Sequence, residues 1–288
     1  HPILNGDDLI SGLYRNVPSW VIDFEESDIL QARKHEVAFK HLQETVLPLW
    51  TKNAEEEKKK TGKSTGEHQG RLQYWWLLKR RRGELIRGIN KLSRYIVCSA
   101  VTKRPIFEFV SRFVRPSNAL KAFLLEDDYS FGILQSGIHW AWFTAKCSTL
   151  TERYRYTPDT VFDTFAWPQE PTLKQVQAVA TAAAALRGLR RKTMAVNGWS
   201  LRDLYRTLEL PGQNPLRDAH QELDAAVRAA YGMKPNEDPL AFLLALNHAV
   251  AEREKKGEPV VGPGLPPCVR DLAPLLTDDC VQPPGLTN

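Results

Sequence analysis

The sequence lacks the motifs of the common nucleotide-binding and hydrolytic enzymes. It has no GxGxxG or GxxxxGK[ST] loop, no GxSxG and no HExxH. The pair Asp127-Asp128 could supply carboxylate ligands to a metal, but no further acidic residues cluster around it with a nuclease-like spacing. A turn that enters a helix is the favoured interpretation of this pair. The residues alone therefore predict no catalytic site and no metal site.

Cysteine is scarce and long apolar runs are missing. The four cysteines stand far apart and form no CxxC or zinc-type spacing with histidine: Cys98, Cys147, Cys268 and Cys280. They fit free thiols in a reducing cytoplasm, although the last two could pair if oxidised. There is no run of about 18 apolar residues and no signal peptide. We expect a cytoplasmic protein without a membrane span.

The 288 residues suffice for two domains. Residues 1–168 mix β-rich segments with helical ones, and residues 169–256 read as successive helices. Residues 257–288 are rich in Pro and Gly and predict an irregular tail, either disordered or lying along the surface. The sequence thus predicts an α+β protein, in which a mixed domain precedes an all-helical one. Since the chain begins at His1 and reads at once as the middle of a protein, we expect it to be part of a longer polypeptide.

Positive charge is concentrated in one stretch. Residues 52–104 hold 15 Lys and Arg against 5 Asp and Glu, a net charge of +10, whereas the whole chain carries +5. Apolar residues at helical spacing predict a helix through 71–94, which would expose Arg80, Arg81 and Arg82 on one face. Such a face is either simply solvated or a contact for the phosphates of nucleic acid.

A second pair of cations, Lys103 and Arg104, falls at the turn of a predicted hairpin. Here too both interpretations stand: an ordinary solvated turn, or charge presented to a DNA groove. Farther along, residues 131–142 predict a short helix, with Ser130 as a possible N-cap. His139 lies between Ile138 and Trp140 and is interpreted as packed rather than catalytic.

Several long motifs occur in the order found in one known family. The segments Asp127-Asp-Tyr-Ser-Phe-Gly-Ile-Leu-Gln-Ser136, His139-Trp-Ala-Trp142 and Thr151-Glu-Arg-Tyr-Arg-Tyr-Thr-Pro158 resemble the target-recognition region of MmeI-like type IIG restriction–modification enzymes. Asn5-Gly-Asp-Asp-Leu9 and Asp218–Gly232 resemble the stretches that flank this region. The resemblance covers about residues 1–250.

The resemblance implies a division of labour. The family's N6-adenine methyltransferase domain, which binds S-adenosylmethionine and carries an Asn-Pro-Pro-aromatic motif, lies upstream, and a nuclease that would use Mg²⁺ lies further upstream still. This chain has neither motif. It therefore resembles the part that recognises double-stranded DNA, needs no cofactor of its own, and works with an upstream methyltransferase domain of the same polypeptide.

The family places its base-reading residues in the loop before its RYTP motif. Carried over residue by residue, they are Thr151, Glu152, Arg153 and Arg155. Relatives often have Glu and Pro where this chain has Thr151 and Tyr154, so the resemblance does not transfer the DNA sequence that is read. Arginine pairs bidentately with guanine and glutamate accepts from cytosine N4. The alternative for these side chains is a structural salt bridge between Glu152 and one of the arginines.

The favoured function is therefore sequence-specific binding of duplex DNA within a restriction–modification enzyme. The loop would read bases, while Arg80, Arg81, Arg82, Lys103 and Arg104 would contact phosphates. The alternative is a specificity or protein-docking module of a nuclease-free phage-defence adenine methyltransferase. Its alanine-rich helices would then contact other proteins.

Overall fold

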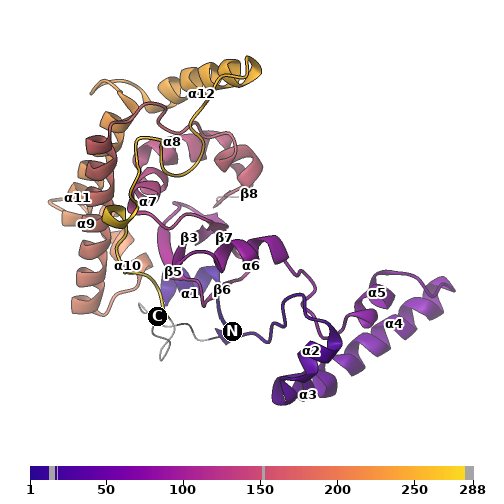
Figure 1. Cartoon of the computed structure of the whole chain (residues 1–288). Coiled ribbons are helices and arrows are strands. Elements are labelled where there is room, and N and C mark those ends of the chain that lie inside the picture. Colours follow the sequence, from indigo (N-terminus) through magenta and orange to yellow (C-terminus); the bar gives the residue numbers. More distant parts are fainter. Residues whose placement is uncertain (13–16, 18, 151–152, 283–288) are drawn as a thin grey trace. The chain divides into compact units, whose positions relative to one another are not determined.

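A computed structural model describes residues 1–12, 17, 19–150 and 153–282 (Figure 1). These residues form two compact units. The first contains residue 1 and residues 20–90, and the second contains residues 2–19 and 91–288, apart from the gaps just given. The boundary that we expected at 168/169 lies within the second unit.

The first unit is helical. Its elements are α2 (Ile29–Arg33), α3 (Glu36–Thr45), α4 (Leu47–Thr61), α5 (Glu67–Gln73) and α6 (Gly83–Ile89). Asp28 caps α2 by accepting a hydrogen bond from the backbone N–H of Gln31, and Gly62 ends α4 in the left-handed conformation, at φ 69°. A small aromatic core, in which Phe39 packs on Trp75 with ring centres 5.2 Å apart, joins the helices.

The continuous helix expected through residues 71–94 is wrong. Helix α5 ends at Gln73, residues 74–82 are irregular, and Arg82 adopts a left-handed conformation at φ 48°, which a helix does not allow. Trp75 and Leu77 are both buried in the core of this unit. Tertiary packing of these two side chains thus outweighs helix propensity, and the arginines that follow lie in a loop.

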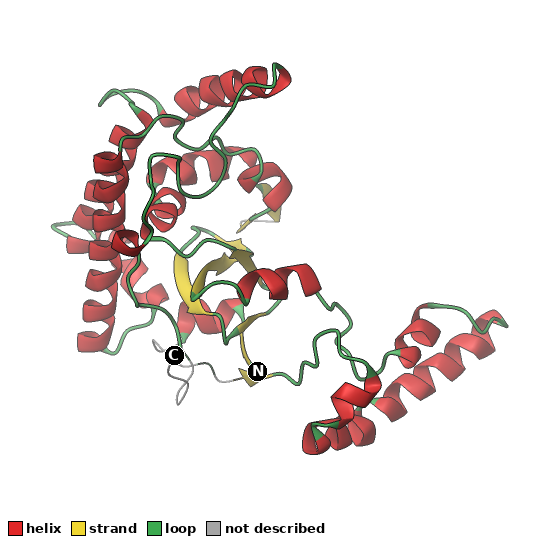
Figure 2. Ribbon diagram, in the orientation of Figure 1, coloured by secondary structure: helices red, strands yellow, loops and turns green. Residues whose placement is uncertain are grey.

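The second unit combines helices with three small sheets (Figure 2). Its strands are β1 (Pro2–Leu4), β2 (Ser19–Trp20, which ends in the first unit), β3 (Arg94–Ser99), β4 (Val101–Thr102), β5 (Phe107–Ser111), β6 (Arg115–Pro116), β7 (Leu120–Phe123), β8 (Ser148–Leu150) and β9 (Arg153–Arg155). Its helices are α1 (Gly6–Ser11), α7 (Asp128–Gln135), α8 (Gly137–Lys146), α9 (Leu173–Asn197), α10 (Leu201–Arg206), α11 (Pro215–Tyr231) and α12 (Pro239–Lys255). Short turns of helix lie at Pro158–Phe162, Thr207–Glu209 and Ala273–Leu275. The predicted α+β class is confirmed.

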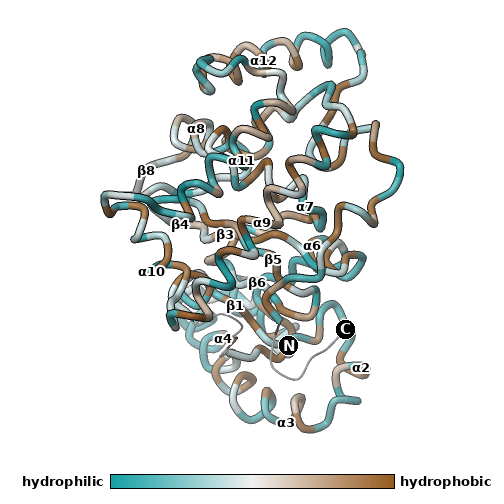
Figure 3. Tube along the Cα trace, turned by 90° about the vertical axis from the view of Figure 1, so that its left-hand side faces the viewer, coloured by the Kyte–Doolittle hydropathy of each residue, from teal (hydrophilic) through white to brown (hydrophobic). Residues whose placement is uncertain are grey.

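The central sheet has the order β5-β3-β7, and both pairings are antiparallel. Ile96 lies opposite Phe109 on one side and Phe123 on the other. Strand β3 is buried from Arg94 to Cys98, and the trace around β3, β5 and α9 is largely hydrophobic (Figure 3). Such burial on both faces explains why the sequence of β3 shows no alternation of polar and apolar residues.

The helix expected at 131–142 is in fact two helices, because Ser136 leaves the helical conformation and caps α8 through the N–H of His139. Asp127, rather than Ser130, caps α7: its carboxylate accepts from the backbone N–H of Ser130 at 2.7 Å. The single helix expected after the Asp127-Asp128 turn is therefore a pair of consecutive capped helices, α7 and α8. This confirms the helix-entry interpretation of Asp127.

Helix α9, with 25 residues, is the longest described helix of the second unit. Thr172 and Gln175 form a capping box at its start, and Gly198 ends it in the left-handed conformation. It packs against α7 and α11. Gly132 of α7 makes this close approach possible, because a Cβ at that position would lie 2.6 Å from Cγ1 of Val179. None of the described helices is long and apolar enough to cross a membrane.

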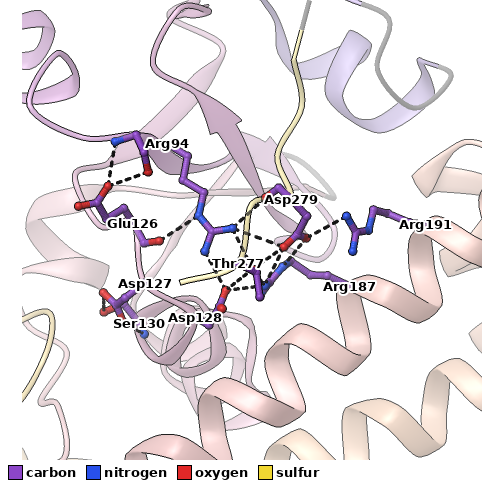
Figure 4. Close-up of polar contacts among 10 residues, drawn as sticks. Arg94, Glu126, Asp127, Asp128, Ser130, Arg187, Arg191, Thr277 and Asp279 are labelled. Atoms are coloured by element: carbon purple, nitrogen blue, oxygen red, sulfur yellow. Dashed lines mark hydrogen bonds and ion pairs between the residues drawn. The ribbon is translucent and has the colours of Figure 1, made fainter. Parts of the chain in front are cut away.

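A buried ionic network joins the sheet, α7, α9 and the C-terminal segment (Figure 4). The carboxylate of Asp128 accepts from Arg94 at 2.9 Å and also from Arg187. Arg187 donates to Asp279 at 2.9 Å, and the hydroxyl of Thr277 donates to Asp128 at 3.1 Å. The two arginine side chains are only 2% and 1% exposed.

This network corrects our expectation of a disordered or surface-lying tail. The described part of the tail, residues 257–282, is mostly irregular, as expected. It nevertheless contributes Thr277 and Asp279 to the interior, and Val281 pairs with Val110 of β5. Buried arginines need such partners, because an unpaired buried charge is strongly unfavourable.

Asp279→Asn tests how much this network contributes to stability. Burial raises the pKa of Asp279, but the hydrogen bond and charge of Arg187 outweigh it and hold the pKa well below its usual range. Removing one charge from a buried pair costs about 3–5 kcal/mol. We expect the free energy of unfolding at pH 7 to fall by about this amount in urea titrations. The exposed neighbour provides the control, because Asp278→Asn should change little.

The same pKa predicts a pH dependence. Since the carboxyl of Asp279 has a lower pKa in the folded protein, it stabilises the fold at pH values above its unfolded pKa, near 4. That contribution is lost as the pH falls further toward the folded pKa. The stability difference between wild type and Asp279→Asn should therefore narrow below about pH 4. A difference that stays constant down to pH 2 would contradict this account.

Candidate nucleic-acid interface

The segment expected to read DNA lies in a three-stranded antiparallel sheet with the order β4-β9-β8. In this sheet Arg155 lies opposite Val101 of β4 and opposite Ser148 of β8. Of the expected base-reading residues, Thr151 and Glu152 lie outside the described residues. Arg153 is the first residue of β9, where it pairs with Leu150.

The side chains from residue 154 to residue 156 alternate between core and solvent. Arg155 is exposed, whereas Tyr154 is half-buried and packs on Phe143 of α8, with ring centres 5.7 Å apart. The next residue but one, Tyr156, is fully buried. This two-residue period presents Arg155 and its cross-strand neighbours, Val101 and Ser148, on an exposed face.

Tyr156 anchors the end of β9 in the core. Its backbone N–H donates to the carbonyl of Ala100 at 2.9 Å, and its hydroxyl lies 3.0 Å from Nε2 of His139. Its ring stacks on Phe143 and meets Phe123 edge to face. Tyr156, which directly follows Arg155, therefore anchors the strand in the core.

His139 is packed, as expected from its neighbours in the sequence. It is completely buried, and its ring lies 4.9 Å from that of Phe165. Burial lowers the pKa of His139 to about 3, so the imidazole is neutral at pH 7. A neutral imidazole held by the Tyr156 hydroxyl serves as a structural partner of β9.

The cations Lys103 and Arg104 lie in the connection between the antiparallel strands β3 and β5, as expected. Lys103 is exposed one residue beyond β4, at the edge of the sheet that contains β9. The guanidinium of Arg104 instead lies over the ring of Trp140, 4.5 Å from its centre. The two neighbours thus have different environments.

The arginine loop belongs to the first unit. Arg80 and Arg81 are exposed, and Arg82 is half-buried at the start of α6. The guanidinium of Arg81 lies 4.6 Å from the ring centre of Tyr74, and Lys79 pairs with Glu67 at 2.6 Å. Arg80 and Arg81 therefore remain accessible to an anion in solution.

A second buried network was not anticipated from the sequence. Arg190 of α9 donates to the carbonyl of Phe107 and to Glu108, each at 3.0 Å, and it also donates to the hydroxyl of Tyr205. That hydroxyl lies 2.9 Å from Nε2 of His220. These residues are far apart in the sequence and follow no motif spacing, so only the tertiary structure reveals them.

The described residues contain no group of three or more His, Cys, Asp and Glu side chains placed to hold a metal ion. Asp127 and Asp128 are committed to the helix cap and to the buried network, respectively. The exposed residues Arg155, Ser148 and Lys103 give the β4-β9-β8 sheet hydrogen-bond donors and positive charge. This arrangement suits binding of an anionic, hydrogen-bonding partner.

Comparison with known proteins agrees with this geometry. The family model of the MmeI target recognition domain matches residues 98–169, and that of the MmeI C-terminal domain matches residues 172–252. The first match contains β9 and the Lys103–Arg104 connection. The arginine loop at residues 80–82 lies outside both matches.

Two individual proteins extend these matches. DNA methyltransferase A of Bacillus subtilis (strain 168) is 30% identical over 140 residues, which are 48% of this chain and 15% of that protein. A solved structure of the type IIL restriction–modification enzyme MmeI in complex with DNA superimposes with a TM-score of 0.65 at 25% identity, over 87% of this chain and 31% of that one. The chain thus spans less than a third of either protein. Residues 98–252 belong to the MmeI family, as its target recognition domain followed by its C-terminal domain.

Proposed function

We propose that this chain is the DNA-recognition module of a restriction–modification enzyme. The observation that carries the proposal is the placement of Arg155. It is exposed on a strand that is anchored in the core by Tyr156, within the segment that matches the MmeI target recognition domain. Arginine is the side chain that most often reads guanine in the major groove.

In this proposal the two groups of residues have different tasks. Thr151, Glu152, Arg153 and Arg155 read base edges, and Arg155 does so from the exposed face of the β4-β9-β8 sheet. Lys103, exposed at the edge of that sheet, and Arg80, Arg81 and Arg82 contact phosphates. Phosphate contacts supply affinity without sequence information, and base contacts supply specificity.

The chemistry of the enzyme belongs to another part of the protein. The sequence has no Asn-Pro-Pro-aromatic motif, the motif that the family's methyltransferase domain carries. We propose that an upstream domain of the same polypeptide binds S-adenosylmethionine and methylates adenine at N6, as in a type IIG enzyme of the cytoplasm. This chain then selects the DNA on which that domain acts.

A methylation assay tests this assignment. The 288-residue chain, mixed with duplex DNA and radiolabelled S-adenosylmethionine, should transfer no label above background, whereas an adenine methyltransferase run in parallel should label the same DNA. Clear turnover by this chain would show that the recognition-only assignment is wrong.

Arg155→Ala tests the reading role. A good arginine–guanine pair discriminates by about 1–3 kcal/mol, which corresponds to about 5- to 150-fold in affinity. We expect the variant to lose its preference at one base pair of the selected sequence, measured by sequencing duplexes bound from a randomised library. Arg155→Lys keeps the charge but not the planar, bidentate hydrogen-bond donors of arginine, so it should lose the same preference. An unchanged preference in both variants would contradict a reading role.

Replacing Arg80, Arg81 and Arg82 by Gln tests the phosphate role. Each lost phosphate contact should reduce the slope of log K against log salt by about 0.9, equally for all duplex sequences. Fluorescence anisotropy titrations between 50 and 200 mM salt measure this slope. The control replaces the exposed Lys58, Lys59 and Lys60 of the same unit by Gln and thus removes the same charge elsewhere. If both triple variants flatten the slope equally, overall charge rather than this loop is responsible.

A further inference from the structure

Arg104 contacts aromatic rings from both matched domains. Its guanidinium carbon lies 4.5 Å from the ring centre of Trp140 in α8 and 5.6 Å from that of Tyr205 in α10. Helix α8 is part of the target recognition domain, and α10 is part of the C-terminal domain. Burial lowers the pKa of Arg104, while the nearby Tyr205 and Asp224 act in the opposite direction. The guanidinium is therefore partly removed from water and held over aromatic faces.

The ring of Tyr205 is itself fixed. Its hydroxyl accepts from Arg190 and lies 2.9 Å from Nε2 of the buried His220 in α11. Burial lowers the pKa of His220 to about 2, so this imidazole is neutral and stays a hydrogen-bonding partner at pH 7. Two helices of the C-terminal domain, α9 and α11, thus hold the ring against which Arg104 packs.

The connection that carries Arg104 is held at two further points. At its far end, Arg190 donates to the carbonyl of Phe107 and to Glu108. At its near end, the Thr102 hydroxyl donates to the carbonyl of Arg104 at 2.6 Å. Thr102 also pairs with Tyr154 of β9. Arg104, Thr102 and Tyr154 thus form a continuous set of contacts from the ring of Tyr205 to the strand that carries Arg155.

We propose that Arg104 is a positioning residue for sequence recognition: stacked on Trp140 and Tyr205, it ties β4, and through β4 the reading strand β9, to the C-terminal helical domain. This inference rests on the proposed function. It replaces the phosphate contact expected for Arg104 from the sequence, and it gives the C-terminal domain a task in recognition.

The stacking explains why an arginine is required at this position. A planar guanidinium packs flat on aromatic rings, whereas a lysine ammonium is a compact and strongly hydrated charge. Arg104→Lys therefore keeps the charge that a phosphate contact needs but removes the stack. The positioning role predicts a large effect of this variant on sequence preference, and the phosphate role predicts a small one.

The test uses the 288-residue chain and a randomised duplex library, with sequencing of the bound fraction. We expect Arg104→Lys to reduce the preference at the base pairs read from β9 by about tenfold. Its affinity for one duplex of arbitrary, unselected sequence should match that of wild type. The slope of log K against log salt should also match. Arg112→Lys is the matched control, because this exposed arginine stacks on Phe113, at 5.0 Å, beyond the other end of β5. It should leave preference and affinity unchanged.

Trp140 provides a second pair of variants at a position that is 36% exposed and thus tolerant of change. Trp140→Phe keeps an aromatic face for Arg104 and should retain the preference. Trp140→Leu removes that face and should reproduce the loss seen with Arg104→Lys. This rescue by an aromatic residue distinguishes positioning from general destabilisation.

The outcomes separate the two proposals. Wild-type protein that selects no sequence from the library would overturn the proposed function itself. Wild type that selects a sequence, together with Arg104→Lys and Trp140→Leu variants that select it as sharply, would overturn the positioning role only. A third outcome is a lower affinity of Arg104→Ala for all duplexes, with a flatter salt slope and an unchanged sequence preference. This result would show that Arg104 contacts phosphate, and it would overturn the positioning role.

Discussion

The second unit depends on the pairing of buried charges around Asp128. One carboxylate at the start of α7 accepts hydrogen bonds from Arg94 of β3 and Arg187 of α9, and Asp279 completes the set. Neither arginine is stable at this depth without its carboxylates, because buried charges require partners. The network therefore fixes how the central sheet, α7 and α9 meet, and it draws the C-terminal segment into the fold. The aromatic residues Phe123, Phe143 and Tyr156 belong to the same core cluster as the buried residues of α7 and α9.

Strand β9 is held in two ways. Tyr156 anchors its end through His139 and a set of aromatic rings, and β4 pairs with it along one side. These contacts hold the backbone that presents Arg155, and a fixed backbone favours discrimination between bases by hydrogen-bond geometry. The surface that contacts DNA in this proposal is small and polar, while the structure that positions it extends into the C-terminal helices.

The sequence predicted much of this organisation and missed a specific part. Local signals predicted the turn at Asp127 and the packed His139, because capping and apolar spacing act over a few residues. The helix through 71–94 was predicted wrongly, since burial of Trp75 and Leu77 overrides helix propensity there. The roles of Asp279 and Tyr205 had no local signal at all. Asp279 is 92 residues away from Arg187, and Tyr205 is 15 residues away from Arg190, so only tertiary contacts define these roles.

The central claim is that the exposed face of β9 touches base edges. Site-specific cross-linking tests it most directly: a photoreactive amino acid replaces Arg155 in one sample and Arg112 in another, and each is irradiated with the duplex that wild type selects. The account predicts that the probe at residue 155 cross-links to one base at a fixed place in the selected sequence and that the probe at residue 112 does not. Cross-links from residue 155 that scatter along the duplex, or that form only from residue 112, would contradict it.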